Sequence, residues 1–304
     1  MTITPVCIVG PTGAGKTGVS LAIAKATDGE VINIDSMQLY RGMDIGTAKI
    51  TPEERGDIPH HLFDIWDITE TASVADYRAR AVAVAEQIMA RNKTPVFVGG
   101  SMMYVQSFVD EWDFPPTDAG VRAKWERKLH DVGVTALHDY LATVDPAAAE
   151  IIESNDPRRT VRALEVIELT GKPFAASQPP KDQPARWNMT ILGLRADAEW
   201  LNPRLEQRVE MMFERGLVEE VRRLKGQGLV RDSTAGQAIG YKQVLDYLDD
   251  QLSMEEAKEQ TIVGTRRYAR RQRSWFQRDK RIQWIQASGD NVIDEAIKRV
   301  RQGE

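Results

Sequence analysis

The sequence of 304 residues contains a single cysteine, Cys7. An intramolecular disulfide and a zinc site built from several cysteines are therefore excluded, and a reducing compartment is expected. Long hydrophobic runs are missing as well, because the longest ones have the length of a β-strand. A membrane-spanning helix needs about 20 apolar residues. Met1 to Pro5 carry no basic residue, unlike the start of a secretory signal. We therefore expect a cytoplasmic globular protein with no membrane partner.

An excess of positive charge is also missing, because 40 Lys and Arg residues against 45 Asp and Glu residues give a net charge of −5. The total charge argues mildly against a nucleic-acid partner, but its distribution argues for one. A stretch near the C-terminus holds many cationic residues and one acid, Asp279. Its cationic residues are Arg266, Arg267, Arg270, Arg271, Arg273, Arg278, Lys280 and Arg281. Such a local cluster can bind a phosphate backbone whatever the net charge.

Strands and helices alternate over the first hundred residues. Short apolar runs at residues 6–9, 31–34 and 95–98 predict buried strands, and helices are expected at residues 15–25 and 73–92. This order predicts an α/β fold with a parallel sheet flanked by helices, of the type that carries a phosphate-binding loop. Ligands of such sheets bind beyond the carboxyl ends of the strands. Gly10, Asp35 and Ser101 all fall there.

The pattern changes at the turn-rich residues 115–118. Three helical stretches follow without a strand, which predicts a small all-helical insertion domain over residues 115–155. Residues 1–114 and 156–304 are then expected to form the core domain, with a further strand at residues 189–194 and helices at the C-terminal end. Asn202 and Pro203 suggest a helix start, and Ser253 with Glu256 forms a capping box for the helix that bears the basic cluster.

The segment from residue 10 to residue 17 matches the phosphate-binding pattern G-x-x-x-x-G-K-[ST] between a predicted strand and a predicted helix. In this arrangement glycines let backbone N–H groups converge on phosphate oxygens, and the helix N-terminus favours negative charge. The lysine reaches the outer phosphate, and the Thr17 hydroxyl can ligate Mg²⁺. The predicted phosphate-binding residues are Gly10, Pro11, Thr12, Gly13, Ala14, Gly15, Lys16 and Thr17.

Asp35 stands at the end of the second predicted strand. In a nucleotide hydrolase an aspartate at such a place often holds Mg²⁺ through water. It can equally act as a general base beside the phosphate site or cap the following turn. Spacing alone does not separate these three roles.

Eight motifs that run in order along nearly the whole chain resemble the tRNA dimethylallyltransferases, also called the tRNA isopentenyltransferase family. They occupy residues 10–17, 35–41, 46–49, 59–62, 99–101, 156–165, 237–242 and 271–276. Eukaryotic members carry a C-terminal zinc finger, and with its one cysteine this chain is similar to the bacterial form. The family usually has Thr at the position of Ser101, so that the hydroxyl is retained here and a methyl group is lost.

The resemblance implies that a dimethylallyl group moves from dimethylallyl diphosphate to N6 of the adenosine immediately 3′ of a tRNA anticodon. The loop then holds the diphosphate that leaves, with Mg²⁺ at Thr17, instead of a nucleotide that is hydrolysed. By the same resemblance Asp35 is the general base, and Ser101 is the second catalytic residue. Arg204 and Arg208 match family arginines, and either add charge near the diphosphate or form surface ion pairs.

The target base has to leave the anticodon loop in order to reach such a site. Residues that follow the second predicted strand would contact this base, and the Gln38 amide suits an adenine edge. In the C-terminal helix Trp275 and Phe276 either stack on bases or pack into the core. The predicted tRNA-binding residues are Asp35, Ser36, Met37, Gln38, Ser101, Arg122, Arg158, Arg159, Arg162, Gly240, Tyr241, Lys242, Arg271, Arg273 and Arg278.

Three other functions use some of the same residues. A kinase of small metabolites and an enzyme that prenylates free adenine nucleotides both need the loop and Asp35, but neither needs the basic helix. An RNA-binding protein without chemistry needs the helix, but not Asp35 and Ser101 at the strand ends. We expect a monomer that binds the anticodon stem-loop of tRNA.

Overall fold

The centre of the protein is a sheet of six parallel strands in the order β3-β2-β4-β1-β5-β6. The computed structural model describes residues 3–112, 114–174 and 183–302. Its strands are β1 (Val6–Val9), β2 (Glu30–Asn33), β3 (His60–His61), β4 (Pro95–Val98), β5 (Thr190–Arg195) and β6 (Gln283–Gln286). The four strands predicted from apolar runs are confirmed, whereas the short β3 and the polar β6 were not predicted. The α/β fold with a parallel sheet is likewise confirmed.

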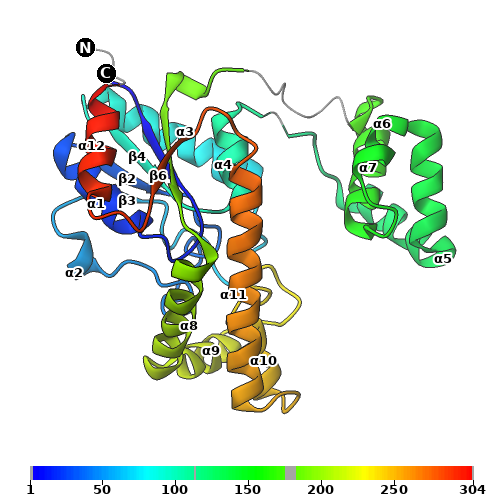
Figure 1. The fold of residues 1–304 in the computed structure, drawn as a ribbon. Coiled ribbons are helices and arrows are strands. Elements are labelled where there is room, and N and C mark those ends of the chain that lie inside the picture. Colours follow the sequence, from blue (N-terminus) through cyan, green and yellow to red (C-terminus); the bar gives the residue numbers. More distant parts are fainter. Residues whose placement is uncertain (1–2, 113, 175–182, 303–304) are drawn as a thin grey trace. The chain divides into compact units, whose positions relative to one another are not determined.

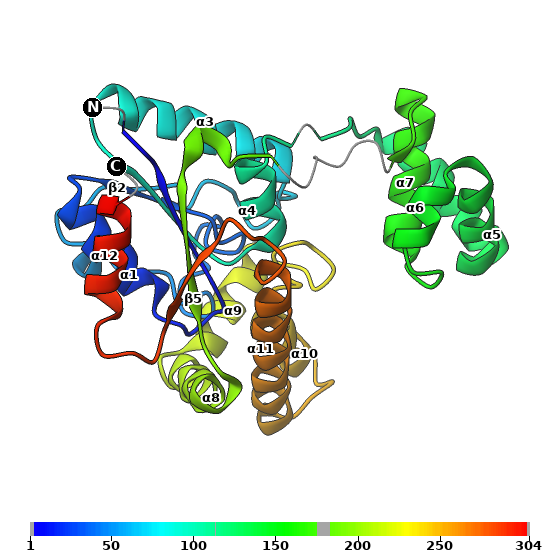
Figure 2. The ribbon, with the colours of Figure 1, turned by 45° about the horizontal axis from the view of Figure 1, so that its top comes forward.

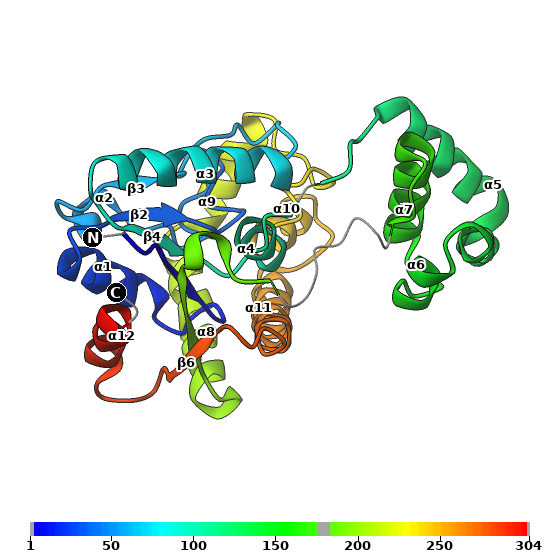
Figure 3. The same cartoon turned by 90° about the horizontal axis from the view of Figure 1, so that it is seen from above.

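Both faces of this sheet are buried, which explains why its strands are continuous apolar runs. Within β1, Cys7 and Val9 point into one hydrophobic cluster, and Val6 and Ile8 point into the other. Helices α3 (Val74–Ala90) and α4 (Met102–Val109) cover the first face, and α1 (Lys16–Ala26) and α12 (Val292–Gln302) cover the second (Figure 3).

Four further helices gather beyond the carboxyl ends of the strands (Figures 1 and 2). They are α8 (Ala198–Glu214), α9 (Leu217–Gly226), α10 (Tyr241–Leu248) and α11 (Met254–Phe276). Two short pieces lie elsewhere, the helix α2 (Pro52–Arg55) and the 3₁₀ turn η2 (Arg186–Asn188). No helix among the described residues is long and apolar enough to cross a membrane.

Two of the helix starts predicted from the sequence are found in the structure, and a third is not. Ser73 caps α3, and Ser253 forms the predicted capping box with Glu256 at the start of α11. The prediction that a helix starts at Asn202 and Pro203 is wrong, because α8 begins five residues before Pro203, at Ala198, and Pro203 lies inside it. The buried side chains of α8, Leu201 among them, hold this first turn against the core in spite of the proline.

Residues Asp110–Gln183 form a unit of their own, separate from the unit made by Met1–Val109 and Pro184–Glu304. We call them the helical unit and the core unit. The helical unit holds α5 (Ala119–Val144), α6 (Pro146–Ile151) and α7 (Pro157–Thr170). The predicted insertion of residues 115–155 was therefore too short, and residues 156–183 do not belong to the core. The apolar face of α7 explains the difference, since Val161 and Leu164 pack with Leu137 and Leu141 of α5.

Candidate active site

The phosphate-binding loop connects β1 to α1, as its sequence predicted. Gly10, with φ +142°, lies so close to β5 that a Cβ there would be 2.7 Å from the carbonyl oxygen of Leu194. Gly15 adopts a left-handed conformation with φ +89° at the N-cap of α1, which a residue with a side chain rarely does. These two positions explain why the loop needs glycine, and they leave the first backbone N–H groups of α1 facing the loop.

The Lys16 side chain folds back over this loop. Its Nζ donates hydrogen bonds to the carbonyl oxygens of Gly10 and Pro11, at 3.0 and 2.8 Å. Burial lowers the pKa of Lys16 to about 8, with Asp35 opposing the change and Arg208 adding to it. The charge of Asp35 therefore favours the protonated form of Lys16, and the charge of Arg208 disfavours it. A polyanion bound in the loop would favour the protonated form further.

Asp35 and Ser101 follow the neighbouring strands β2 and β4, so that both lie at the carboxyl edge of the sheet. The Asp35 carboxylate accepts a hydrogen bond from the backbone N–H of Met37 at 3.0 Å. The Ser101 hydroxyl is almost fully buried, accepts from the backbone N–H of Ser36 at 2.9 Å and donates to the Ser36 hydroxyl at 3.1 Å. Ser101 therefore fixes the backbone that carries Asp35.

The charge of Asp35 acts on two aromatic hydroxyls and on one guanidinium. Burial and then the charge of Asp35 raise the pKa of Tyr268 to about 12, and burial with Tyr40 and Asp35 also raises that of Tyr104. Burial lowers the pKa of Arg208, while Asp35 opposes this change. Of the two family arginines, Arg208 is thus the one whose charge interacts with Asp35 and Lys16.

Arg204, one turn earlier on α8, instead stacks on Trp200 with its guanidinium 4.4 Å from the ring centroid. Of the two roles that the sequence left open for this pair, proximity to the phosphate loop therefore belongs to Arg208. The two arginines are four residues apart, and Arg204 is exposed whereas Arg208 is half-buried.

Gln272 joins the two loops of the site, a role that its sequence context did not predict. It lies on α11 and is 2% exposed. Its Oε1 accepts a hydrogen bond from the backbone N–H of Thr12 at 2.9 Å, and its Nε2 donates one to the carbonyl oxygen of Gly100 at 2.9 Å. The only sequence signal was its place in the motif at residues 271–276.

Two residues predicted to contact tRNA have structural roles instead. The ring of Tyr241 is fully buried and its hydroxyl donates to Glu220 Oε1 at 2.5 Å, so that the prediction that Tyr241 binds RNA is wrong. Its neighbour Gly240 is the N-cap of α10. The Gln38 amide donates to the carbonyl oxygen of Thr47 at 3.0 Å, which leaves its oxygen as the group for an adenine edge.

A groove between α10 and α11 collects positive charge. We call it the basic groove; its cationic lining comprises Lys242, Arg267, Arg270 and Arg271. Gln237 and Gln243 add amides to its wall. Arg278 is exposed further along the chain, whereas Phe276 is buried and Trp275 packs partly against the core. The basic groove thus contains the predicted residues Lys242 and Arg271. Of the two alternatives for Trp275 and Phe276, packing into the core is the one that the structure shows.

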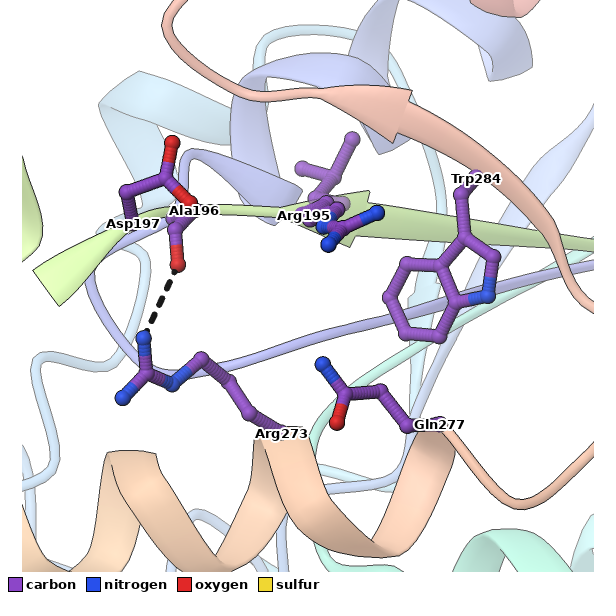
Figure 4. Close-up of a pocket in the computed structure, with 7 residues that line it drawn as sticks. Arg195, Ala196, Asp197, Arg273, Gln277 and Trp284 are labelled. Carbon is purple, nitrogen blue, oxygen red and sulfur yellow. Dashed lines mark hydrogen bonds between the residues drawn. The ribbon is translucent and has the colours of Figure 1, made fainter.

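Arg273 lies on another side of α11. Its guanidinium donates to the carbonyl oxygen of Ala196 at 3.3 Å and lines a cavity of about 60 Å³ beside the end of β5 (Figure 4). Arg195, Gln277 and Trp284 line the same cavity. Arg273 is therefore not part of the basic groove, contrary to its grouping with Arg271.

In the helical unit, Arg122 and Arg162 are held by one buried acid. Glu165 is fully buried and pairs with Arg122 at 2.6 Å and with Arg162 at 2.8 Å. Both guanidiniums are thus paired, although the Arg122 side chain remains 42% exposed, and their contacts with tRNA stay predictions. Arg158 and Arg159, at the first turn of α7, are exposed.

Thr17 and Asp35 are the oxygen donors that a metal ion at the loop could use. Thr17 is exposed at the start of α1. Within the described ranges, no group of three or more His, Cys, Asp or Glu residues could hold a metal ion. Such a sparse donor set fits Mg²⁺, which in phosphate sites takes one or two protein oxygens and completes its shell with substrate phosphates and water.

The fold and this site define a phosphate-loop α/β protein with an acid and a hydroxyl group at the edge of the sheet. The model of the IPP transferase family matches residues 38–279. A tRNA dimethylallyltransferase of Corynebacterium jeikeium is 68% identical over 97% of this chain and 96% of its own, and one of Corynebacterium efficiens is 65% identical over 95% and 97%. The chain belongs to the IPP transferase family.

Solved structures agree with this assignment. A full-length tRNA isopentenylpyrophosphate transferase from Bacillus halodurans is 40% identical, with a TM-score of 0.72 over 99% of this chain and 96% of that one. A eukaryotic dimethylallyltransferase, whose structures show it acting on tRNA, is 28% identical with a TM-score of 0.80. It is matched over 98% of this chain and 77% of its own.

Proposed function

We propose that this protein transfers the dimethylallyl group of dimethylallyl diphosphate to N6 of the adenosine immediately 3′ of a tRNA anticodon. One observation carries this proposal: in a member of this family, a phosphate loop, Asp35 and Ser101 meet at one edge of the sheet beside the basic helix α11. The family relatives are named for this reaction. A small-metabolite kinase would not need the basic groove.

In this reaction the bond between the allylic carbon and the diphosphate oxygen breaks, and the oxygen keeps the electron pair. Negative charge therefore grows on the leaving diphosphate. The Lys16 ammonium, the loop N–H groups and the nearby Arg208 guanidinium stabilise that charge. The glycines of the loop and α1 position the loop N–H groups and Lys16 before the reaction begins, and α8 carries Arg208.

The adenine N6 attacks the allylic carbon, and a new C–N bond forms. This amine is a weak nucleophile because its lone pair is delocalised into the ring. Asp35 accepts its hydrogen bond and then its proton, acting as the general base. The Ser101 hydroxyl holds the backbone at Ser36, and through it the Asp35 carboxylate, in place for this transfer.

A base within a stacked anticodon loop cannot reach the sheet edge, so the adenosine must be extruded. The exposed arginines of the basic groove suit the phosphates that flank it. Gln38, whose amide nitrogen is already bonded, presents its oxygen as an acceptor for an adenine amino group.

Mg²⁺, for which Thr17 and Asp35 are the available protein donors, would supply further positive charge to the leaving diphosphate. Asp35 is also needed as the base. We therefore assign Thr17 as the protein ligand, with the remaining donors coming from the diphosphate and water.

The test incubates the protein with labelled dimethylallyl diphosphate, Mg²⁺ and either unmodified tRNA or AMP. We expect label on a tRNA that has adenosine next to the anticodon, and none on AMP. Transfer to AMP alone would favour prenylation of free nucleotides, and transfer to neither would contradict the proposal. An Asp35→Ala variant should lose at least about 100-fold in rate, as expected for a positioned base.

A further inference from the structure

Among the described residues, Gln272 is a buried polar residue whose contacts the proposed reaction leaves unexplained. It comes from α11, yet its carboxamide sits between two loops that are far from it in sequence. We propose that Gln272 is a positioning residue, which fixes the phosphate loop and the loop of residues 99–101 at the separation that group transfer requires. This inference rests on the proposed function and assigns it one further residue.

Both polar atoms of the Gln272 carboxamide are used by backbone. Oε1 accepts from Thr12, in the loop that would hold the leaving group, and Nε2 donates to Gly100, next to Ser101. A buried amide that is satisfied at both ends strongly prefers one arrangement, because breaking either bond leaves a buried polar group unpaired. With both ends engaged, Gln272 acts on the reaction through the two loops.

The space around this amide allows little movement. A Cβ placed on Gly100 would lie 2.2 Å from Gln272 Nε2 and 3.0 Å from the carbonyl oxygen of Gly10. The two loops are therefore in close approach, with the carboxamide filling the gap between them. One turn earlier on the same helix, the Tyr268 hydroxyl donates to the same carbonyl oxygen of Gly100 at 3.4 Å.

This separation matters because the two loops hold opposite sides of the reaction. The phosphate loop holds the leaving group, and Ser101 holds the backbone of the acid that receives the proton. Reacting atoms must approach to about 3–3.5 Å, and a misplacement of about 1 Å can cost about 100-fold in rate. Without the carboxamide, β1 and β4 would still pair and Gly99 would still donate to the carbonyl oxygen of Ile8, but Thr12 and Gly100 would lose the side chain that joins them.

The test replaces Gln272 by a side chain of similar length without hydrogen-bonding groups, in Gln272→Met. We expect kcat for prenyl transfer to tRNA to fall about 10- to 100-fold, while KM for tRNA stays within about twofold. Gln260→Met is the matched control, because Gln260 is exposed on the same helix, and it should keep the wild-type kcat. Thermal unfolding of each variant checks that the fold is kept.

A double-mutant cycle with Ser101→Ala separates positioning from a general loss of stability. If Gln272 acts through the loop that carries Ser101, the losses of the two single variants will not add in the double variant. Gly100→Ala should displace the carboxamide from the other side and give the same loss, which keeps the test open if Gln272→Met does not fold.

Two results would overturn the inference: a wild-type kcat in Gln272→Met, or losses that add fully with Ser101→Ala. Failure of the wild-type protein to label any tRNA would instead contradict the proposed function. The two failures are therefore distinguishable in one set of assays.

Discussion

At the scale of single residues, charge and burial oppose each other around the phosphate loop. Lys16 and Arg208 are cations whose pKa values burial lowers, and Asp35 is the acid that opposes both changes. A bound diphosphate would add negative charge to this group. The cations of the site are thus most strongly stabilised when the substrate is present, as expected of groups arranged for a polyanion.

The lowered pKa of Lys16 predicts that the affinity for inorganic diphosphate falls as the pH rises through about 8. The sign follows because a lysine with a lowered pKa loses its proton, and with it its attraction for the anion, earlier than an ordinary lysine. One pH unit above its pKa, only about a tenth of Lys16 remains protonated, so that binding should weaken about tenfold between pH 7 and pH 9. Calorimetric titration at the two pH values measures this change.

Lys16→Arg is the control for this prediction, because a guanidinium remains charged over the whole range. Its affinity should show no such fall between pH 7 and pH 9. The same tenfold decrease in this variant would show that another group, and not Lys16, controls the affinity.

Residue types and their local order were enough to predict the phosphate loop and the strand-end positions of Asp35 and Ser101, because each depends on a short segment. Tyr241 and Gln272 depend on tertiary packing. Nothing near Tyr241 indicates that its hydroxyl meets Glu220 of α9, and Gln272 gains its role from loops about 170 and 260 residues away. Pro203 likewise lies inside α8, where packing outweighed the local preference.

At the scale of helices, α11 presents different sets of side chains on different sides. One side carries Tyr268 and Gln272 toward the loops of the site, and another carries arginines into the basic groove. The spacing of about 3.6 residues per turn produces this division from one continuous sequence. The helix can therefore bind an outer partner without giving up its inner contacts.

Charge reversal in the basic groove tests its outer role. Arg267→Glu, Arg270→Glu and Arg271→Glu should each weaken binding of an anticodon stem-loop and reduce the salt dependence of binding by about one phosphate contact. Filter binding over a range of salt concentrations measures both quantities. Lys298→Glu on α12 makes the same charge change on an exposed position elsewhere, and it should leave the slope unchanged.

Glu165 makes the stability of the helical unit depend on pH. Although burial alone would raise its pKa, hydrogen bonds from Arg122 and Arg162 lower the pKa below the ordinary value. Such a group stabilises the folded unit above its unfolded pKa, and this contribution is lost as the pH falls through its folded pKa. The helical unit should therefore lose stability in acid.

Glu165→Gln should destabilise the helical unit by about 1.5–3 kcal/mol, because two partly exposed arginines lose their charged acceptor. Hydrogen exchange within α5 and α7 measures this loss. Glu168→Gln on the same helix breaks a more exposed pair with Lys124 and should cost no more than about 1 kcal/mol. Equal effects of the two variants would contradict the central role of Glu165.

At the scale of the whole molecule, the two units have separate cores. The hydrophobic cluster of the helical unit contains Leu137, Leu141 and Leu164, and the clusters on the two faces of the sheet belong to the core unit. All residues of the phosphate site lie in the core unit. A ligand of that site is therefore expected to stabilise one unit directly.

Saturation with inorganic diphosphate and Mg²⁺ should raise the unfolding temperature of the core unit by about 5–10 °C. A ligand at about 100 times its Kd contributes about 2.7 kcal/mol, and each kcal/mol moves the midpoint by about 2–4 °C for a unit of this size. Hydrogen exchange followed by mass spectrometry should show new protection in α1 and β1 but none in α5. Equal protection of both units would contradict this expectation.

The single cysteine has a practical consequence for studying these two units. Cys7 is fully buried in β1, and burial raises the pKa of its thiol to about 12, so that it is unreactive in the native protein. Cysteines introduced at exposed positions, such as Arg158 on α7 and Lys298 on α12, would then be the ones that accept maleimide dyes. A fluorophore pair can thus be attached to an otherwise unaltered chain, and energy transfer between the dyes would report the distance between the units while tRNA binds.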